Sequence, residues 1–137
     1  MILADTGAVL ALLDADDGHH EEVVELFRAT GEDWVLPWAI LPEIDYLVGR
    51  HAGVDASAAF LADLADGAWP VEWGDAADLD RAHRILIRYP DLELGLVDAV
   101  VMAMAERLEA EAIATLDLRD FGAVSIAGTP RLLPRDG

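Results

Sequence analysis

The chain has 137 residues, of which 54% are hydrophobic, and this length and composition suit one domain over residues 1–137 with a real core. Its 27 acidic residues against nine basic ones, a formal net charge of −18, argue against the broad basic face that captures nucleic acid. The absence of cysteine excludes disulfides and thiolate sites, and no apolar run approaches the ~20 residues of a membrane span, so we expect a cytoplasmic protein.

Strand-like and helical patterns alternate along the chain. Strands are expected where apolar residues run together, and helices where they recur every three or four positions. Glycine and proline mark the breaks, most clearly at Gly31, residues 49–53 and Pro90. In chain order the expected elements are a strand at 1–4, a helix that Thr6 can cap, a helix at 19–29, a strand at 34–36, helices at 40–48 and 57–66, a strand at 71–73, a helix from Asp75 or Asp78, a helix at 97–108, and strands at 112–116 and 123–126.

This order predicts an α/β fold with a central, mainly parallel sheet flanked by helices on both faces. Sites in such folds lie beyond the carboxyl ends of the strands. Asp5 and Asp117 each follow a strand-like run, and Asp98 lies at a helix start, where the helix dipole favours an anion. Glu43 lies beside the buried stripe of its helix. The chain therefore permits these four acids to converge.

Four carboxylates gathered within ~4 to 6 Å repel one another, and the chain has no lysine to neutralise them. A divalent cation is the simplest compensation. Ligands that are all oxygen indicate Mg²⁺ or Mn²⁺, which also coordinate substrate phosphates. Such a site activates water and stabilises charge on a leaving oxygen, so the expected chemistry is phosphodiester hydrolysis. No other general base is evident.

Each acid also has a purely structural interpretation. Asp5 and Asp98 are good helix-start residues, and Asp117 is a common turn former. Glu43 is ambiguous because Asp45 lies nearby on the same expected helix. An arginine stripe at positions 81, 84 and 88 suits RNA phosphates, or a solvated face paired with neighbouring aspartates such as Asp78, Asp80 or Asp91. The joint arrangement of the four acids favours function.

Four short motifs carry a resemblance to a known family. They are Leu3-Ala4-Asp5-Thr6-Gly7-Ala8-Val9-Leu10, Leu41-Pro42-Glu43-Ile44, Leu94-Gly95-Leu96-Val97-Asp98-Ala99, and Ala114-Thr115-Leu116-Asp117-Leu118-Arg119-Asp120-Phe121-Gly122. In this order, over essentially the whole chain, they resemble the PIN-domain family, most closely VapC-type toxins of bacterial toxin/antitoxin pairs. The resemblance implies a PIN-like three-layer fold and a metal-dependent endoribonuclease, often a homodimer, that a VapB-like antitoxin blocks.

The resemblance also implies roles for individual residues. The catalytic residues would be Asp5, Glu43, Asp98 and Asp117, with Thr6, Thr115 and Asp120 in support. Asp5 and Asp98 would bind the metal ion, with Glu43 and Asp117 binding directly or through water. Asp120 would assist or replace Asp117, and the two threonine hydroxyls would orient carboxylates or waters.

The acidic charge departs from what RNA binding needs, which favours a narrow, structured RNA target or help from a few arginines. Trp38 beside Leu41 suits an antitoxin groove, although core packing is the default for tryptophan. The alternative function is a catalytically inactive PIN-like domain that acts as a partner-binding module.

Overall fold

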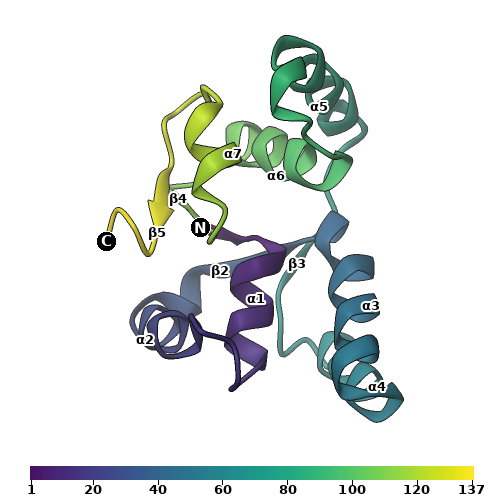
Figure 1. Cartoon of the computed structure of the whole chain (residues 1–137). Coiled ribbons are helices and arrows are strands. Elements are labelled where there is room, and N and C mark those ends of the chain that lie inside the picture. The colour runs from purple at the N-terminus through teal and green to yellow at the C-terminus, as the bar shows by residue number, and fades with distance from the viewer.

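The computed structural model describes residues 1–137 and is built on a five-stranded sheet in the order β3-β2-β1-β4-β5 (Figure 1). Every neighbouring pair is parallel. The strands are β1 (Ile2–Ala4), β2 (Trp34–Pro37), β3 (Val71–Glu72), β4 (Ala112–Ala114) and β5 (Arg131–Leu133). The expected parallel sheet is therefore confirmed.

Helices cover both faces of this sheet. They are α1 (Thr6–Leu13), α2 (His20–Thr30), α3 (Leu41–Ala52), α4 (Val54–Ala65), α5 (Ala76–Arg88), α6 (Leu96–Arg107) and α7 (Leu118–Ala123), with short 3-10 turns η1 (Gly31–Asp33), η2 (Trp38–Ile40) and η3 (Pro90–Leu92). Figure 1 shows α1 to α4 on one side of the sheet and α5 to α7 on the other. None of these helices could span a membrane.

The core is built around three apolar segments of the chain that are buried without interruption. β1 and β4 are buried at every residue, as expected of parallel strands covered on both faces. Helix α6 is buried at seven consecutive positions, Ala99 to Ala105, so it is surrounded by protein on all sides. Because the middle of α6 is central to the core, the position of its first turn, which carries Asp98, is fixed.

The strand order places the functional edge of the molecule. From β1 the chain moves outward to β2 and β3, then returns to β4 on the other side of β1. Such a reversal opens a crevice at the carboxyl ends of the two strands where ligands bind in α/β folds. The backbone N–H of Asp5 donates to the carbonyl of Ala114 at 2.8 Å, so the two strand ends lie side by side. The residues after β1 and β4 therefore share this crevice.

Two expected elements were wrong. The expected strand at 123–126 does not form, because the chain winds into α7 as far as Ala123 and the last strand comes later, as β5. The expected break at 49–53 is confined to Gly53, whose φ of 91° ends α3. Helix α3 continues through Gly49, where an added Cβ would lie 3.8 Å from the Cβ of Ser57 in α4. This distance is an ordinary van der Waals contact, so Gly49 neither ends α3 nor is required for its packing against α4.

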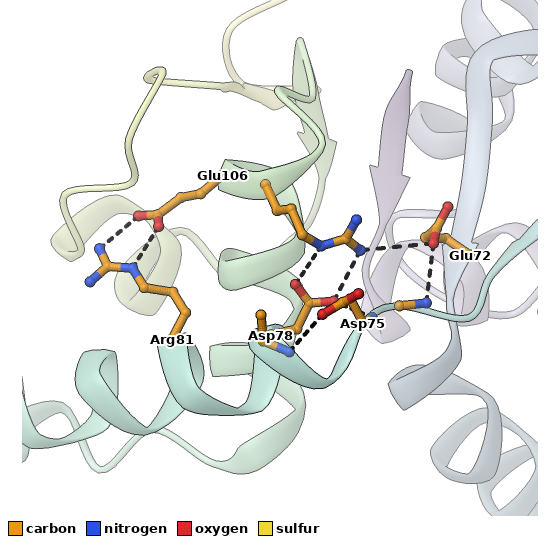
Figure 2. Close-up of polar contacts among 8 residues, drawn as sticks. Glu72, Asp75, Asp78, Arg81 and Glu106 are labelled. Atoms are coloured by element: carbon orange, nitrogen blue, oxygen red, sulfur yellow. Dashed lines mark hydrogen bonds and ion pairs between the residues drawn. The ribbon is translucent and has the colours of Figure 1, made fainter.

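A buried ion pair fastens α5 to α6 (Figure 2). Asp78, 2% exposed, accepts from Nε of Arg107 at 2.7 Å and from Nη2 at 3.0 Å. It also completes a capping box with Asp75 at the start of α5. A second bidentate pair joins Arg81 to Glu106 at 2.6 and 2.9 Å. These two pairs add to the apolar attachment of α5, whose Ala82 and Ile85 are buried in the core.

The arginine stripe of α5 is thus engaged within the protein. Arg81 pairs with Glu106 of α6, not with the neighbouring aspartates, whereas Arg84 pairs with Asp80 at 3.2 Å. The guanidinium of Arg88 lies 5.5 Å from the centre of the Tyr89 ring. These contacts favour the paired-face interpretation over an RNA-binding stripe.

The ion pair of Asp78 predicts a stability difference between two arginine variants. Arg107→Ala leaves the Asp78 carboxylate buried without its cation, so we expect a loss of about 3 kcal/mol in the free energy of unfolding. Arg84→Ala removes a pair whose two side chains are about two-thirds exposed, so it should unfold like the wild type. Urea denaturation measures both, and equal losses would contradict a structural role for the Asp78 pair.

Candidate active site

Three carboxylates converge at the crevice between β1 and β4. One oxygen from each of Asp98, Asp117 and Asp120 lies within 4.8 Å of the others, and all three side chains are half-buried. Asp98 is the third residue of α6, and Asp120 is the third residue of α7. Asp117 caps α7 by accepting from the N–H of Asp120 at 3.1 Å. Helix starts therefore deliver all three acids to one point.

Asp5 lies behind this group and is joined to it through Thr115. Asp5 is 6% exposed, and Thr115 is fully buried. The Thr115 hydroxyl donates to Oδ2 of Asp5 at 3.1 Å and accepts from the N–H of Asp117 at 3.0 Å. One hydroxyl thus fixes the Asp5 carboxylate relative to the start of α7. The expected orienting role of Thr115 has a geometric basis, although its catalytic role stays a prediction.

Thr6 and Glu43, two further expected site residues, lie outside this hydrogen-bonded group. The Thr6 hydroxyl is buried but makes no hydrogen bond, so it orients no carboxylate within the protein. Glu43, the third residue of α3, is exposed and directly precedes the buried Ile44. It lies outside the group of three acids that share the 4.8 Å sphere, yet its charge raises the pKa of Asp5 and Asp98. Glu43 therefore borders the cluster.

Burial and mutual repulsion raise the pKa values of the central acids. Burial, followed by the charges of Asp5, Asp117, Asp120 and Glu43, raises the pKa of Asp98 to about 7. Because Asp98 senses every other acid of the group, it is the electrostatic centre of the site.

The pKa of Asp5 is also raised, to about 6, chiefly by burial. The N–H of Thr6 and the hydroxyl of Thr115 oppose this rise, whereas the charges of Asp117 and Glu43 add to it. For Asp120, burial comes first and repulsion from Asp117 second, and nearby Arg119 acts in the opposite direction to lower its pKa. Groups coupled in this way titrate as a unit.

The donor set fits a hard divalent cation. Oδ1 of Asp120 is buried without a hydrogen-bond partner, as is the hydroxyl of Thr6. An unsatisfied buried oxygen costs about 1–3 kcal/mol, and coordination to a cation would remove that cost. Oxygen ligands and a closely spaced group of carboxylates are what such ions require. A cation would also relieve the repulsion that raises the pKa of Asp98.

The purely structural interpretations of the acids, as helix caps or turn formers, hold for Asp117 but not for Asp5. Asp5 is at the N-cap position of α1 but makes no side-chain capping hydrogen bond, so helix capping does not account for it. Asp117 does cap a helix, and it belongs to the acid group as well. The sequence missed α7 itself, whose signal was an acid at the cap followed three residues later by Asp120.

Comparisons with known proteins agree with this geometry. A family model described as PIN domain matches residues 2–126. Ribonuclease VapC26 of Mycobacterium tuberculosis is 37% identical over 130 residues, which cover 95% of this chain and 96% of that protein.

Two solved structures show the same fold. The crystal structure of M. tuberculosis VapC20, described as a sarcin-ricin loop cleaving toxin, has a TM-score of 0.82 at 24% identity and covers 93% of this chain and 98% of that chain. DNA-bound VapBC from Salmonella typhimurium has a TM-score of 0.71 at 17% identity, with 96% and 97% coverage.

The raised pKa of Asp98 predicts how metal-free stability depends on pH. A carboxyl with a raised folded pKa binds protons more readily in the folded state, so the protein should gain stability as pH falls from 8 through 7 toward 5. Asp98→Asn should be more stable than the wild type at pH 8 in EDTA, by about 1–2 kcal/mol after allowance for solvent screening. This advantage should shrink by pH 5.

Thermal unfolding across this pH range measures the effect, with Asp91→Asn as an exposed control that should follow the wild type. Mg²⁺ should reverse the ranking, because ligand at about ten times its dissociation constant adds roughly 1.4 kcal/mol to the form that binds it. If Asp98→Asn is instead less stable at pH 8 in EDTA, Asp98 is an ordinary helix-start residue.

Proposed function

The chain belongs to the PIN-domain family, and from this premise we propose that it is a VapC-type toxin, a metal-dependent endoribonuclease that hydrolyses RNA phosphodiesters. The observation that carries the proposal is the meeting of Asp98, Asp117 and Asp120 in front of the buried Asp5. The 37% identity to a ribonuclease over nearly the whole of both chains supports it. We also propose that residues 1–137 act as one domain and that the protein is a cytoplasmic homodimer.

We assign the catalytic roles to Asp5, Glu43, Asp98 and Asp117, supported by Thr6, Thr115 and Asp120. Asp5 and Asp98 would hold Mg²⁺, or Mn²⁺, with Glu43 and Asp117 as direct or water-mediated ligands. The ion, when bound, supplies positive charge for the phosphate oxygens and promotes ionisation of the attacking water.

The residues of the chain supply position. Thr115 holds Asp5 in place, and the start of α7 holds Asp117 beside Asp98. The side chain of Glu43, exposed at the rim, is free to accept a hydrogen bond from water. This arrangement suits in-line attack on a phosphodiester held over the acids.

The antitoxin would occupy an apolar groove of about 420 Å³ between α3, α4 and β3. Its lining residues are Leu41, Pro42, Asp45, Phe60, Leu61, Leu64, Ala65, Val71 and Trp73. Leu41 is in the first turn of α3, the same turn that carries Glu43. Trp38 does not line it and lies against Gly74 instead. We propose that a VapB-like antitoxin fills this groove and places an arginine against the acids.

The proposed activity predicts RNA cleavage that depends on a divalent metal. Purified protein free of antitoxin should cut structured ribosomal RNA with Mg²⁺ or Mn²⁺ and should stop in EDTA. Asp98→Asn should lower the rate constant about a hundredfold or more, because it removes the central ligand of the cluster. Asp91→Asn, exposed and outside the cluster, should keep wild-type activity.

Gel-based cleavage assays measure these rates. Full activity in excess chelator would remove the mechanism. A protein that binds its antitoxin tightly but cleaves nothing with either metal would favour the alternative, a catalytically inactive PIN-like partner-binding module.

The proposed groove predicts a partner-binding defect that is separate from catalysis. Trp73 is 73% exposed at the groove, so Trp73→Ala should weaken antitoxin binding roughly thirtyfold, as expected for an aromatic hot spot, and leave RNA cleavage unchanged. Ile87→Ala, which removes an exposed apolar side chain from α5 outside the groove, should bind the antitoxin normally. Titration calorimetry measures both affinities. Equal affinities for the two variants would place the antitoxin elsewhere.

A further inference from the structure

The chain has nine arginines and no lysine, against a net charge of −18. Most of these arginines already contact other side chains of the protein. Five form ion pairs, in the order Arg28–Glu25, Arg81–Glu106, Arg84–Asp80, Arg107–Asp78 and Arg135–Asp136. Arg50 donates to the Tyr46 hydroxyl at 3.0 Å, and Arg88 lies over the Tyr89 ring. Arg119 and Arg131 alone make no ion pair, side-chain hydrogen bond or ring contact.

These two unengaged arginines lie at opposite ends of the strands, Arg119 after the carboxyl end of β4 and Arg131 at the amino end of β5. Arg119 is exposed in the first turn of α7, between Asp117 and Asp120 in the sequence. Arg131 is exposed at the first residue of β5, where its backbone N–H donates to the carbonyl of Glu111 just before β4. The site acids follow the carboxyl ends of β1 and β4, whereas Arg131 begins its strand. Of the two, only Arg119 therefore lies at the carboxyl ends of the strands, where the site is.

The two acids that flank Arg119 do not pair with it. Asp117 uses Oδ1 to cap α7, and Asp120 has a buried oxygen that faces inward. Both are half-buried, while the guanidinium is exposed. Arg119 and Asp120 are consecutive residues in the first turn of α7, and the charge of Arg119 accordingly lowers the pKa of Asp120. An unpaired cation thus stands beside the greatest concentration of negative charge in the site.

RNA needs a cation at this place. Each phosphate brings a negative charge, and a metal ion held by the acids compensates only the phosphate being cleaved. The phosphates on either side meet a protein surface that is strongly acidic. Guanidinium groups bind phosphate through two parallel hydrogen bonds, and a free one at the rim is available for that contact without breaking an ion pair.

We propose that Arg119 binds the RNA phosphate next to the scissile one and so positions the backbone over the acid cluster. This inference rests on the proposed ribonuclease function and adds to it the residue that overcomes the acidic charge. Arg119 acts as a substrate-positioning residue, and the acids carry the chemistry.

The test compares Arg119→Ala and Arg119→Lys with Arg131→Ala, which removes the same charge at the opposite ends of the strands, away from the site. RNA affinity is measured by fluorescence anisotropy over a range of salt concentrations, with each change made in the Asp98→Asn background and with the RNA that the wild type cleaves. Arg119→Ala should raise the dissociation constant about tenfold and reduce the steepness of log K against log[salt] by about 0.7 to 0.9, the value for one phosphate contact. Arg119→Lys should keep the wild-type slope, and Arg131→Ala should change neither quantity.

Steady-state cleavage kinetics provide the second readout, measured with the native aspartate at position 98 so that the protein is active. Arg119→Ala should raise KM about tenfold and leave kcat within about twofold, because the contact is made equally before and during the reaction. The inference would be overturned by an unchanged salt slope, by a loss in kcat alone, or by the same effect from Arg131→Ala. In each of these cases the proposed function would still stand, provided that the wild type cleaves RNA. Weakened antitoxin binding with normal RNA binding would assign Arg119 to the partner and overturn it too. A wild type that cleaves no RNA would remove the proposed function and this inference with it.

Discussion

Asp5, Asp98, Asp117 and Asp120 repel one another because the fold holds their carboxylates together at one edge of a sheet, in a chain that has no lysine. The rest of the structure makes this repulsion tolerable. Each acid stands at the N-cap or the third residue of a helix, where the positive end of the helix dipole offsets part of its charge. The same parallel topology that gathers the acids therefore also supplies the partial charges that permit them.

The parts of the fold that hold the site rigid lie away from it. The buried α6 carries Asp98 at its amino end, and near its carboxyl end Glu106 and Arg107 pair with Arg81 and Asp78 of α5. Thr115 does comparable work on the other side, between Asp5 and the start of α7. Charged pairs are thus kept at the far end of α6, and no arginine forms an ion pair with the cluster. Its negative charge stays available for a cation.

Features with a local signal were predictable from the sequence, and features that depend on distant contacts were not. An apolar run ending in an acid located Asp5 and Asp117 beyond two strands, and this placement follows from the run alone. Helix α7 has only six residues and includes Gly122, so it shows too little periodicity to be recognised. The exposure of Glu43 depends on how α3 packs, and the Asp78–Arg107 pair joins residues 29 positions apart. Neither can be read from spacing.

The hydrogen bond between Thr115 and Asp5 joins residues 110 positions apart. The two residues follow β1 and β4, which are neighbours in the sheet but are synthesised first and nearly last. A ribosome builds the chain from its amino terminus, so Asp5 emerges long before β4 and α7 exist. The nascent chain has β1 without the strand that completes its edge, and it lacks Asp117 and Asp120 altogether. The acid cluster of the site is therefore incomplete while the chain is still being synthesised. The cluster is complete only once β4 and α7 have docked beside β1.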